Sequence, residues 1–265
     1  MWWLVLGCAG EPSPPTGDGA SPTGETSGPG TAQRLVDCGS DVLVELTDAA
    51  RPGRGSEGYP RPDAATRDAF AASMRAVLAD DAPAAEERAA AAGYAVCRSG
   101  DLVRWRSSTT GAPAVILRTG GAAGLVVGAP HPSFDTSTLE ESAVIFAETR
   151  ARALIAAGSH RCANATPSAC SGQTSVCSDA REAYPESDMA HVVDSIFQVA
   201  HEVLLASFPD DLVISVHGMA GDGVSLSDGP TAPTTAQSVV ARLAGALATE
   251  LPDQIDGITS CNDYP

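Results

Sequence analysis

The sequence predicts a single α/β domain in which helices flank a mixed, largely parallel central sheet. Three observations support this fold class. Apolar strand-like runs alternate with helix-like stretches from about residue 34 onward. The second half has the order strand, helix, strand, helix, strand, which implies parallel strands joined by helical crossovers. A chain of 265 residues is also long enough for one substantial hydrophobic core.

The expected elements follow one another with short breaks. Ala-rich helical patterns cover residues 63–78 and 82–92, and an Asp-Asp-Ala-Pro break separates them. Closely spaced apolar runs then favour an antiparallel part of the sheet, at residues 94–98, 102–105, 114–117 and 125–127. The later elements are a helix at 137–150, a strand at 153–157, a helix at 188–208 and a strand at 212–216. No apolar run inside the domain is long enough to span a bilayer.

The amino-terminal segment differs in composition from the domain. Residues 1–8 form a short apolar run ending in Val5-Leu6-Gly7-Cys8, which resembles the lipobox of bacterial lipoproteins, although it is shorter and lacks a basic start. Residues 9–33 are rich in Pro, Gly, Ser and Thr, and as a random coil this tether would reach roughly 25 to 30 Å. We therefore expect an exported protein that a lipid on Cys8 anchors to the bacterial cell envelope. The domain covers residues 34–265 and ends without an obvious final strand and helix, as in a truncated product.

Charge excludes one class of partner. All sixteen basic residues are Arg, and they face thirty-three acidic residues, which gives a net charge of −17. Such a chain repels phosphate backbones, so we expect neither nucleic-acid binding nor electrostatic attachment to an anionic membrane. A solvated acidic surface accounts for most of this charge.

The cysteines also indicate an exported protein. Apart from Cys8, the chain has an even six, which suits up to three disulfides outside the cytoplasm. The alternative is that Cys162, Cys170 and Cys177 bind a metal. No Cys-x-x-Cys spacing occurs, however, so disulfides are the favoured interpretation.

The five histidines carry the strongest functional signal. All lie between residues 131 and 217. His131 and Asp135 stand on one loop after an apolar strand, and His217 follows another strand, so all three belong to the edge of an α/β sheet where ligands bind. Two imidazoles and a carboxylate are suitable ligands for a catalytic metal with an open coordination position. The alternative for each histidine alone is a polar group that merely caps a turn or a strand.

Several standard catalytic motifs are absent from the sequence. There is no Gly-x-Ser-x-Gly nucleophile elbow and no Walker phosphate loop. His201-Glu202 begins like the His-Glu-x-x-His motif of zinc peptidases, but Leu205 stands where the second histidine would be.

The order His131, Asp135, Glu140-Glu141, helix, strand, His217-Gly218 resembles zinc-dependent amidohydrolases and carboxypeptidase-like peptidases. Poly-γ-glutamate hydrolase and N-formylglutamate amidohydrolase are the nearest patterns, over roughly residues 124–220. The resemblance implies a phosphorylase/hydrolase-like fold and Zn²⁺ held by His131, Asp135 and His217. The spacing between His131 and the acid departs from the usual pattern, so Glu140 and Glu141 stay as rival ligands.

Supporting roles fall on two further segments. After the strand at 153–157, Arg161 is expected to clamp a substrate carboxylate, with Asn164 supporting it and His160 beside or on the metal. The resembled peptidases use Arg and Asn in this way, and the alternative is an Arg paired with local acids in a loop stapled through Cys162. His191 is expected near the amino end of a helix, with Ser187-Asp188, as a group supporting the site.

The proton-transfer group is the weak point of this interpretation. Carboxypeptidase-like enzymes use a Glu on a late strand, and none follows His217 in a suitable place. Either Glu141 is the general base or the chain is inactive. The sequence thus supports an exported, lipid-anchored metallohydrolase acting on an amide bond beside a carboxylate, in a peptide, N-acyl amino acid or γ-glutamyl polymer. The alternatives are a non-catalytic surface lipoprotein that binds with the same fold and, more remotely, deacetylase-like chemistry.

Overall fold

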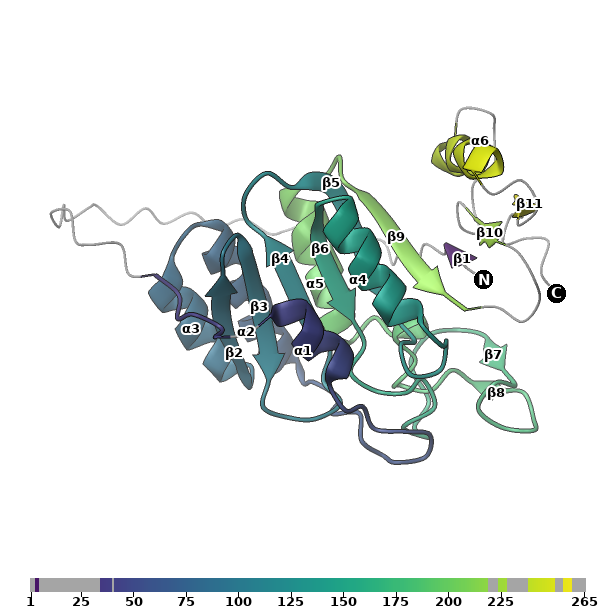
Figure 1. Ribbon diagram of the computed structural model, residues 1–265. Coiled ribbons are helices and arrows are strands. Elements are labelled where there is room, and N and C mark those ends of the chain that lie inside the picture. Colours follow the sequence, from purple (N-terminus) through teal and green to yellow (C-terminus); the bar gives the residue numbers. More distant parts are fainter. Residues whose placement is uncertain are drawn as a thin grey trace, which may run out of the picture.

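The protein is described from a computed structural model. It places residues 34–39, 41–218, 224–227 and 238–250, together with the backbone of residues 3–4 and 255–258. These residues form one α/β domain with a mixed sheet between helices (Figure 1), which confirms the predicted fold class, although antiparallel strand pairs outnumber parallel ones in a sheet that was expected to be largely parallel. The lipobox with Cys8, the linker at 9–33 and the end of the chain after residue 258 lie outside the described residues.

Six strands form the main sheet, and its parallel part carries the site. In spatial order they are β9 (Leu212–His217), β5 (Ala123–Ala129), β6 (Ala151–Ala156), β4 (Ala114–Arg118), β3 (Leu102–Ser107) and β2 (Tyr94–Ser99). Strand β5 runs parallel to both β6 and β9, whereas β6–β4, β4–β3 and β3–β2 are antiparallel pairs. The first three closely spaced apolar runs, which form β2, β3 and β4, are therefore the antiparallel part, as predicted. The fourth run, at 125–127, was wrongly included, because it lies in β5 and belongs to the parallel part with the strand–helix–strand repeat.

Three shorter strands extend the main sheet, and two others pair with each other in a loop. Beyond β9 the order continues with β1 (Trp3–Leu4), β10 (Val224–Leu226) and β11 (Ile255–Ile258). A separate pair, β7 (Gln173–Thr174) and β8 (Glu182–Ala183), lies in the long segment between β6 and the next helix.

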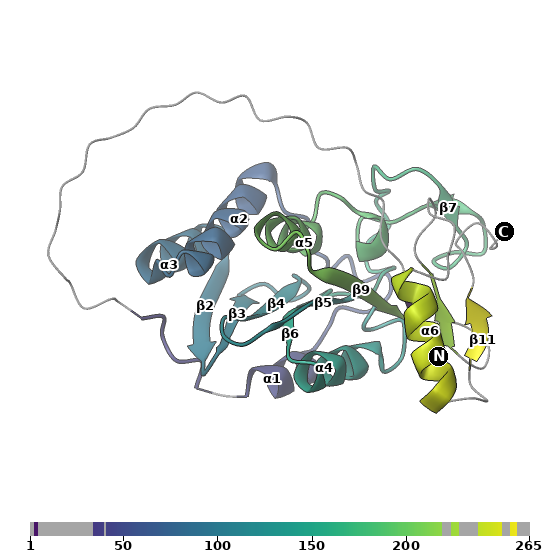
Figure 2. The same cartoon turned by 90° about the horizontal axis from the view of Figure 1, so that it is seen from above.

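Helices cover both faces of the sheet. Figure 2 shows α2 (Ala64–Leu78), α3 (Ala82–Ala91) and α5 (Ile196–Ser207) on one face, and α1 (Val42–Asp48) and α4 (Thr138–Glu148) on the other. A further helix, α6 (Val239–Glu250), packs beside β11. Local capping explains two of the starts: the side chains of Asp63 and Asp81 accept hydrogen bonds from Thr66 N (2.7 Å) and Ala84 N (3.1 Å), as good N-cap residues do.

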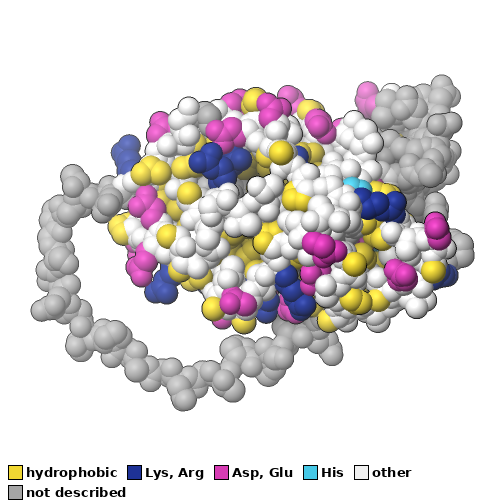
Figure 3. All heavy atoms as spheres, turned by 90° about the horizontal axis from the view of Figure 1, so that it is seen from below, with side chains coloured by type: hydrophobic (Ala, Val, Ile, Leu, Met, Phe, Trp, Pro, Cys, Tyr) yellow, Lys and Arg dark blue, Asp and Glu magenta, His cyan; other side chains and the backbone are white. Residues whose placement is uncertain are grey.

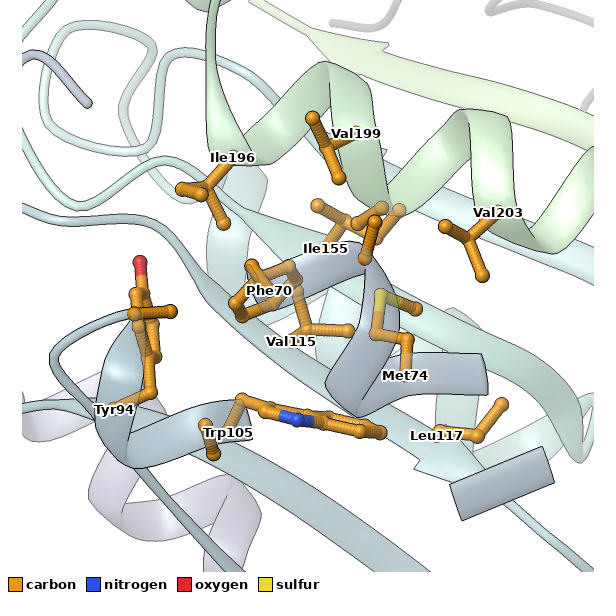
Figure 4. Close-up of a cluster of buried hydrophobic side chains, with 14 of the residues drawn as sticks. Phe70, Met74, Tyr94, Trp105, Val115, Leu117, Ile155, Ile196, Val199 and Val203 are labelled. Atoms are coloured by element: carbon orange, nitrogen blue, oxygen red, sulfur yellow. The ribbon is translucent and has the colours of Figure 1, made fainter. Parts of the chain in front are cut away.

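The alternation of side chains along the strands divides the core into two clusters. In β4, Val115 and Leu117 face the α2/α5 side, and Ile116 faces the α1/α4 side. Figure 4 shows the larger cluster, in which Phe70, Met74 and Trp105 are fully buried. The indole N–H of Trp105 keeps a hydrogen bond inside this cluster, because it donates to Ser73 Oγ at 2.9 Å.

The crossovers place a ligand edge at the carboxyl ends of β5, β6 and β9. The chain passes from β5 through α4 to its neighbour β6, and then through α5 to β9 on the other side of β5. Helices α4 and α5 lie on opposite faces, so the winding of the sheet reverses at β5 (Figure 2). Open α/β sheets bind ligands at such a reversal, outside the carboxyl ends of the strands.

The expected helix at 188–208 is wrong over its first eight residues. A short 3₁₀ turn, η1 (Met189–His191), comes first, and α5 begins only at Ile196, after Ser195, whose hydroxyl accepts from Gln198 N at 3.0 Å. His191 and Asp194 therefore precede the helix. His201, within α5, packs on β5, with its Nε2 atom 3.3 Å from the position that a Cβ atom at Gly128 would take.

Two disulfides join distant segments, Cys38–Cys97 and Cys162–Cys177. Disulfides of this kind persist outside the cytoplasm, so they indicate an oxidising compartment. Cys261 lies outside the described residues, and the expected third disulfide stays a prediction. Among the helices of the described residues, none has the length and hydropathy needed to cross a membrane.

Candidate metal centre

Three strands deliver the predicted site residues to one edge of the sheet. His131 follows the end of β5, Arg161 lies in the loop after β6, and His217 is the last residue of β9. The three strands are adjacent and parallel, so their carboxyl ends share an edge. The edge is well covered: His131 is 1% exposed and Asp135 6%, and Figure 3, which views the molecule from below, shows only a small histidine surface next to arginine.

His131, Asp135 and His217 converge through one atom each. His131 Nδ1 lies 3.3 Å from Asp135 Oδ2 and 3.2 Å from His217 Nδ1, and His217 Nδ1 lies 3.6 Å from the same carboxylate oxygen. Two bonds of about 2.0 to 2.1 Å at a tetrahedral metal place their donor atoms about 3.3 Å apart. The three measured separations therefore match a triangle of ligands around one ion.

The chemistry of these atoms also fits a cation. Asp135 Oδ2 is buried and makes no hydrogen bond of acceptable geometry, which is costly for a carboxylate oxygen unless a cation accompanies it. The two Nδ1 atoms face each other, so at most one of them can carry a proton between them. The described part of the chain contains no other group of three or more His, Cys, Asp or Glu side chains arranged in this way. This group can hold a metal ion.

Local structure presents Asp135 to the two histidines. The loop turns back on itself, because Asp135 N donates to His131 O at 2.8 Å and Thr138 Oγ1 donates to Asp135 O at 2.8 Å. On the opposite side, Gly218 allows close approach: a Cβ atom there would lie 3.0 Å from Asp135 Cβ. The backbone N–H of Gly218 also hydrogen-bonds to the Asp135 carboxylate. A side chain at position 218 would therefore press against Asp135.

A second carboxylate holds the other side of His131. Asp188 Oδ1 lies 2.6 Å from His131 Nε2, and Asp188 Oδ2 accepts from Arg161 Nε at 3.1 Å and from Arg161 Nη2 at 2.6 Å. Asp188 is fully buried. A carboxylate on the far nitrogen of a ligating histidine is a common way to orient the ring toward a metal.

The surroundings shift the pKa values of His131 and His217 in opposite directions. Burial opposes a charge on His131, but Asp188 and Asp135 outweigh it and raise the pKa of the His131 imidazole. Burial lowers the pKa of His217. Burial also opposes ionisation of the two carboxyls, yet His131 and its charged neighbours hold the pKa of Asp135 and of Asp188 well below the usual range. Both acids are therefore ionised at neutral pH, as metal ligation and its support require.

The structure assigns Arg161 and Asn164 to protein contacts. Two of the three guanidinium nitrogens of Arg161 face Asp188, which matches the alternative of pairing with a local acid. Asn164 accepts from Tyr59 N at 2.9 Å and donates to Tyr59 O and Glu186 Oε1 at 3.0 and 2.9 Å. Its amide group thus joins three segments and is not placed to support a substrate.

His160 and His191 lie near the centre without entering the triangle. His160 Nδ1 accepts from Cys162 N at 2.9 Å, so the neutral ring carries its proton on Nε2, and the ring packs edge-on against half-exposed Phe134. Burial and the nearby Arg54 and Arg161 lower the pKa of His160. His191 stacks on Tyr184 with ring centroids 3.6 Å apart, and burial lowers its pKa to about 4. Both rings are neutral at neutral pH.

Glu140 and Glu141 do not join the metal-ligating group. Both lie in the first turn of α4, and among the described residues no hydrogen bond or ion pair links either carboxylate to His131 or His217. Asp135 is the acid of the triangle. Burial and the neighbouring Glu140 raise the pKa of Glu141 to about 7, a value suited to proton transfer near neutral pH.

Sequence reasoning did not identify the direct bond between Asp188 and His131. The only signal was the position of Ser187-Asp188 shortly before a helix, which suggested a supporting role without a partner.

Comparisons with family models, curated proteins and solved structures find no match. The resemblance to zinc-dependent amidohydrolases therefore stays a prediction from the sequence.

Proposed function

We propose that this protein is an exported zinc-dependent hydrolase that cleaves an amide bond beside a carboxylate. The observation that carries the proposal is the triangle of His131 Nδ1, Asp135 Oδ2 and His217 Nδ1, whose sides of 3.2 to 3.6 Å suit one tetrahedral ion. Three protein ligands leave one coordination position open, which is the pattern of catalytic rather than structural zinc. Zinc bound there would polarise an amide carbonyl and lower the pKa of a water molecule.

The remaining residues supply positioning and proton transfer. Asp188 orients His131, and the Nε2–H group of neutral His160 is a hydrogen-bond donor for a substrate oxygen. Glu141 is the carboxyl group whose pKa, raised to about 7, suits a general base, and α4 brings it to the same end of the sheet as Asp135. The charge of Arg54 near His160 favours a substrate that carries a carboxylate, such as an N-acyl amino acid or a γ-glutamyl peptide.

Metal content measured by mass spectrometry tests the first half of this proposal. Wild-type protein purified with added zinc should carry one zinc ion per chain, and His131→Ala and His217→Ala should carry none while keeping the wild-type circular dichroism spectrum. A wild-type protein without stoichiometric zinc would sink the hydrolase proposal.

Hydrolysis assays test the second half. The zinc-loaded protein should hydrolyse N-acyl glutamates or γ-glutamyl peptides, and Glu141→Gln should keep its zinc and lose activity by roughly 10²- to 10⁴-fold, as removal of a general base does. Glu140→Gln, one position away and exposed, is the control and should stay active.

A second function is favoured by one specific observation. The described residues place no carboxylate other than Asp135 and the fully bonded Asp188 in contact with the two histidines, so a metal-loaded but non-catalytic binding protein is consistent with the geometry. Stoichiometric zinc without hydrolysis of any carboxylate-bearing amide would support this reading. In both cases we propose a lipid anchor on Cys8, which mass spectrometry of the amino-terminal peptide from membrane fractions would detect.

A further inference from the structure

We propose that Arg161 and Asp188 act together as a tautomer lock that forces His131 to present Nδ1, and not Nε2, to the metal. The inference rests on the proposed metal centre for its purpose, but its geometry concerns the protein alone. In this view Arg161 is a positioning residue and not the clamp for a substrate carboxylate that the sequence suggested.

The two carboxylate oxygens of Asp188 have different partners. Oδ1 faces His131 Nε2 at 2.6 Å, and Oδ2 receives both the Nε and Nη2 groups of Arg161. Both ring nitrogens of His131 face an ionised carboxylate, but only the contact of Nε2 with Asp188 Oδ1 is a hydrogen bond, since Nδ1 lies 3.3 Å from Asp135 Oδ2, which has no hydrogen-bond partner. A neutral His131 ring therefore carries its one proton on Nε2, facing a carboxylate that can only accept. The neutral ring then has Nε2–H and a lone pair on Nδ1, which points at Asp135 and His217.

Arg161 determines which hydrogen bonds the side chain at position 188 can form. A guanidinium group donates only and keeps its charge at all accessible pH values, so it always requires an acceptor at its side of Asp188. Asp188 is fully buried and the Arg161 side chain is only 12% exposed, so water does not easily replace either partner. The arginine also lies over the ring of Phe134, with its Cζ atom 5.4 Å from the ring centre, which holds it next to the loop of Asp135.

This arrangement makes a prediction that a simple structural ion pair does not. An asparagine at position 188 has one oxygen and one NH₂ group for two neighbours. Arg161 claims the oxygen, so the NH₂ group turns to His131 Nε2 and donates to it. The His131 ring must then carry its proton on Nδ1, where the metal should bind. When Arg161 is also replaced by a residue without donors, the asparagine is free to turn its oxygen back to His131.

A double-mutant cycle of Asp188→Asn and Arg161→Met tests the lock through zinc affinity, measured by competition with a chromophoric chelator. In the wild-type background Asp188→Asn should weaken zinc binding by roughly 10- to 100-fold, the usual cost of losing a partner of a ligating histidine. In the Arg161→Met background the same change should cost only a few-fold. An equal cost in both backgrounds would overturn the proposal, because Arg161 would then have no part in orienting residue 188.

The ring nitrogens can be observed directly and without metal. In metal-free wild-type protein at alkaline pH, ¹⁵N NMR should show His131 with a protonated Nε2 and an unprotonated Nδ1, and Asp188→Asn should reverse this. A wild-type His131 with its proton on Nδ1 overturns the proposal even if no variant folds. This readout also separates the two proposals, since a protein that binds no zinc would still show the locked tautomer.

The pair Arg152–Asp211 provides a matched control. It is a similarly covered ion pair at the opposite edge of the same strands, and it has no histidine beyond it. Asp211→Asn should lower the melting temperature and leave both the His131 tautomer and the zinc affinity at wild-type values. If Asp211→Asn weakened zinc binding as much as Asp188→Asn, the loss would reflect general destabilisation and the lock would be refuted.

Discussion

The two edges of the parallel strands carry ion pairs of the same type with different consequences. At the amino edge, Arg152 bonds to both carboxylate oxygens of Asp211 and lies 3.7 Å above the ring of Phe208. At the carboxyl edge, Arg161 bonds to only one oxygen of Asp188, and the other oxygen faces His131. The hydrogen bonds of the first pair join only Arg152 and Asp211. The second pair also contacts His131, whose other ring nitrogen faces the unsatisfied Oδ2 of Asp135.

This difference shows what distinguishes a site from a structural contact. A buried pair whose donors and acceptors are all used has nothing left to bind, and its removal is expected to change stability alone. A chain of contacts that ends in lone pairs aimed at one point can be completed by a bound cation. The useful signal at the carboxyl edge is therefore the atom without a partner and not the number of charges.

The largest expected effect follows from removing the charge at that atom. Asp135→Asn keeps the shape of the side chain but replaces a charged ligand by a weak one, so zinc affinity should fall by roughly 100-fold or more. Chelator competition measures the change, and the far-ultraviolet spectrum should stay that of the wild type. Unchanged zinc affinity would show that the metal, if any, binds elsewhere.

The Arg152–Asp211 pair should respond in the opposite way. Asp211→Asn leaves Arg152 without its charged partner, and because the pair is partly open to solvent we expect a loss of about 1 to 3 kcal/mol in the free energy of unfolding. Denaturant titration gives this value, and zinc affinity should not change. Together with Asp135→Asn, this result would separate stability from ligation at the two edges.

Substituting one glycine at each edge compares the two edges through their packing contacts. A Cβ atom at Gly218 would lie 3.0 Å from Asp135 Cβ, and one at Gly124 would lie 2.8 Å from Asp211 Oδ1. Gly218→Ala should displace Asp135 by a few tenths of an ångström and weaken zinc binding about tenfold, because metal ligation tolerates little movement. Gly124→Ala should disturb only the Arg152–Asp211 pair, with zinc affinity retained. Equal effects of the two substitutions on zinc would contradict this account.

A further expected effect concerns acid stability and involves neither ion pair. Burial lowers the pKa of His201 to about 4, below the usual 6.5. Between these values the unfolded chain binds a proton that the folded chain does not, so stability falls as pH drops from about 6.5 to 4 and is unaffected above that window. His201→Leu should reduce this fall in the free energy of unfolding by roughly 1 to 3 kcal/mol. A slope of stability against pH equal to the wild type would show that His201 is not responsible.

The fold and the metal triangle could be predicted because both depend on local patterns. Apolar runs followed by His131 and His217 mark strand ends, and strand ends of a parallel sheet share an edge. The start of α5 could not be predicted in the same way: residues 188–195 have a helical pattern, but the Ser195 cap starts the helix at Ile196. Tertiary contacts of Asp188 with His131 and Arg161 hold the preceding segment in place instead.

The supporting residues were harder to predict because their partners are distant in sequence. Asp188 meets His131 across 57 positions, and Asn164 meets Tyr59 across 105. No spacing rule connects such pairs. A polar residue in a loop looks the same in the sequence whether it serves a substrate, as was expected of Asn164, or fastens one segment of backbone to another, as it does here.

X-ray absorption spectroscopy of the zinc-loaded protein is the decisive measurement for the metal triangle, because it identifies the atoms bound to the ion. We expect one zinc ion per chain with two imidazole nitrogens and only oxygen ligands besides, all at about 2.0 to 2.1 Å. Loss of one imidazole contribution in His217→Ala would support the assignment. Sulfur at about 2.3 Å, or a shell unchanged in His217→Ala, would contradict it.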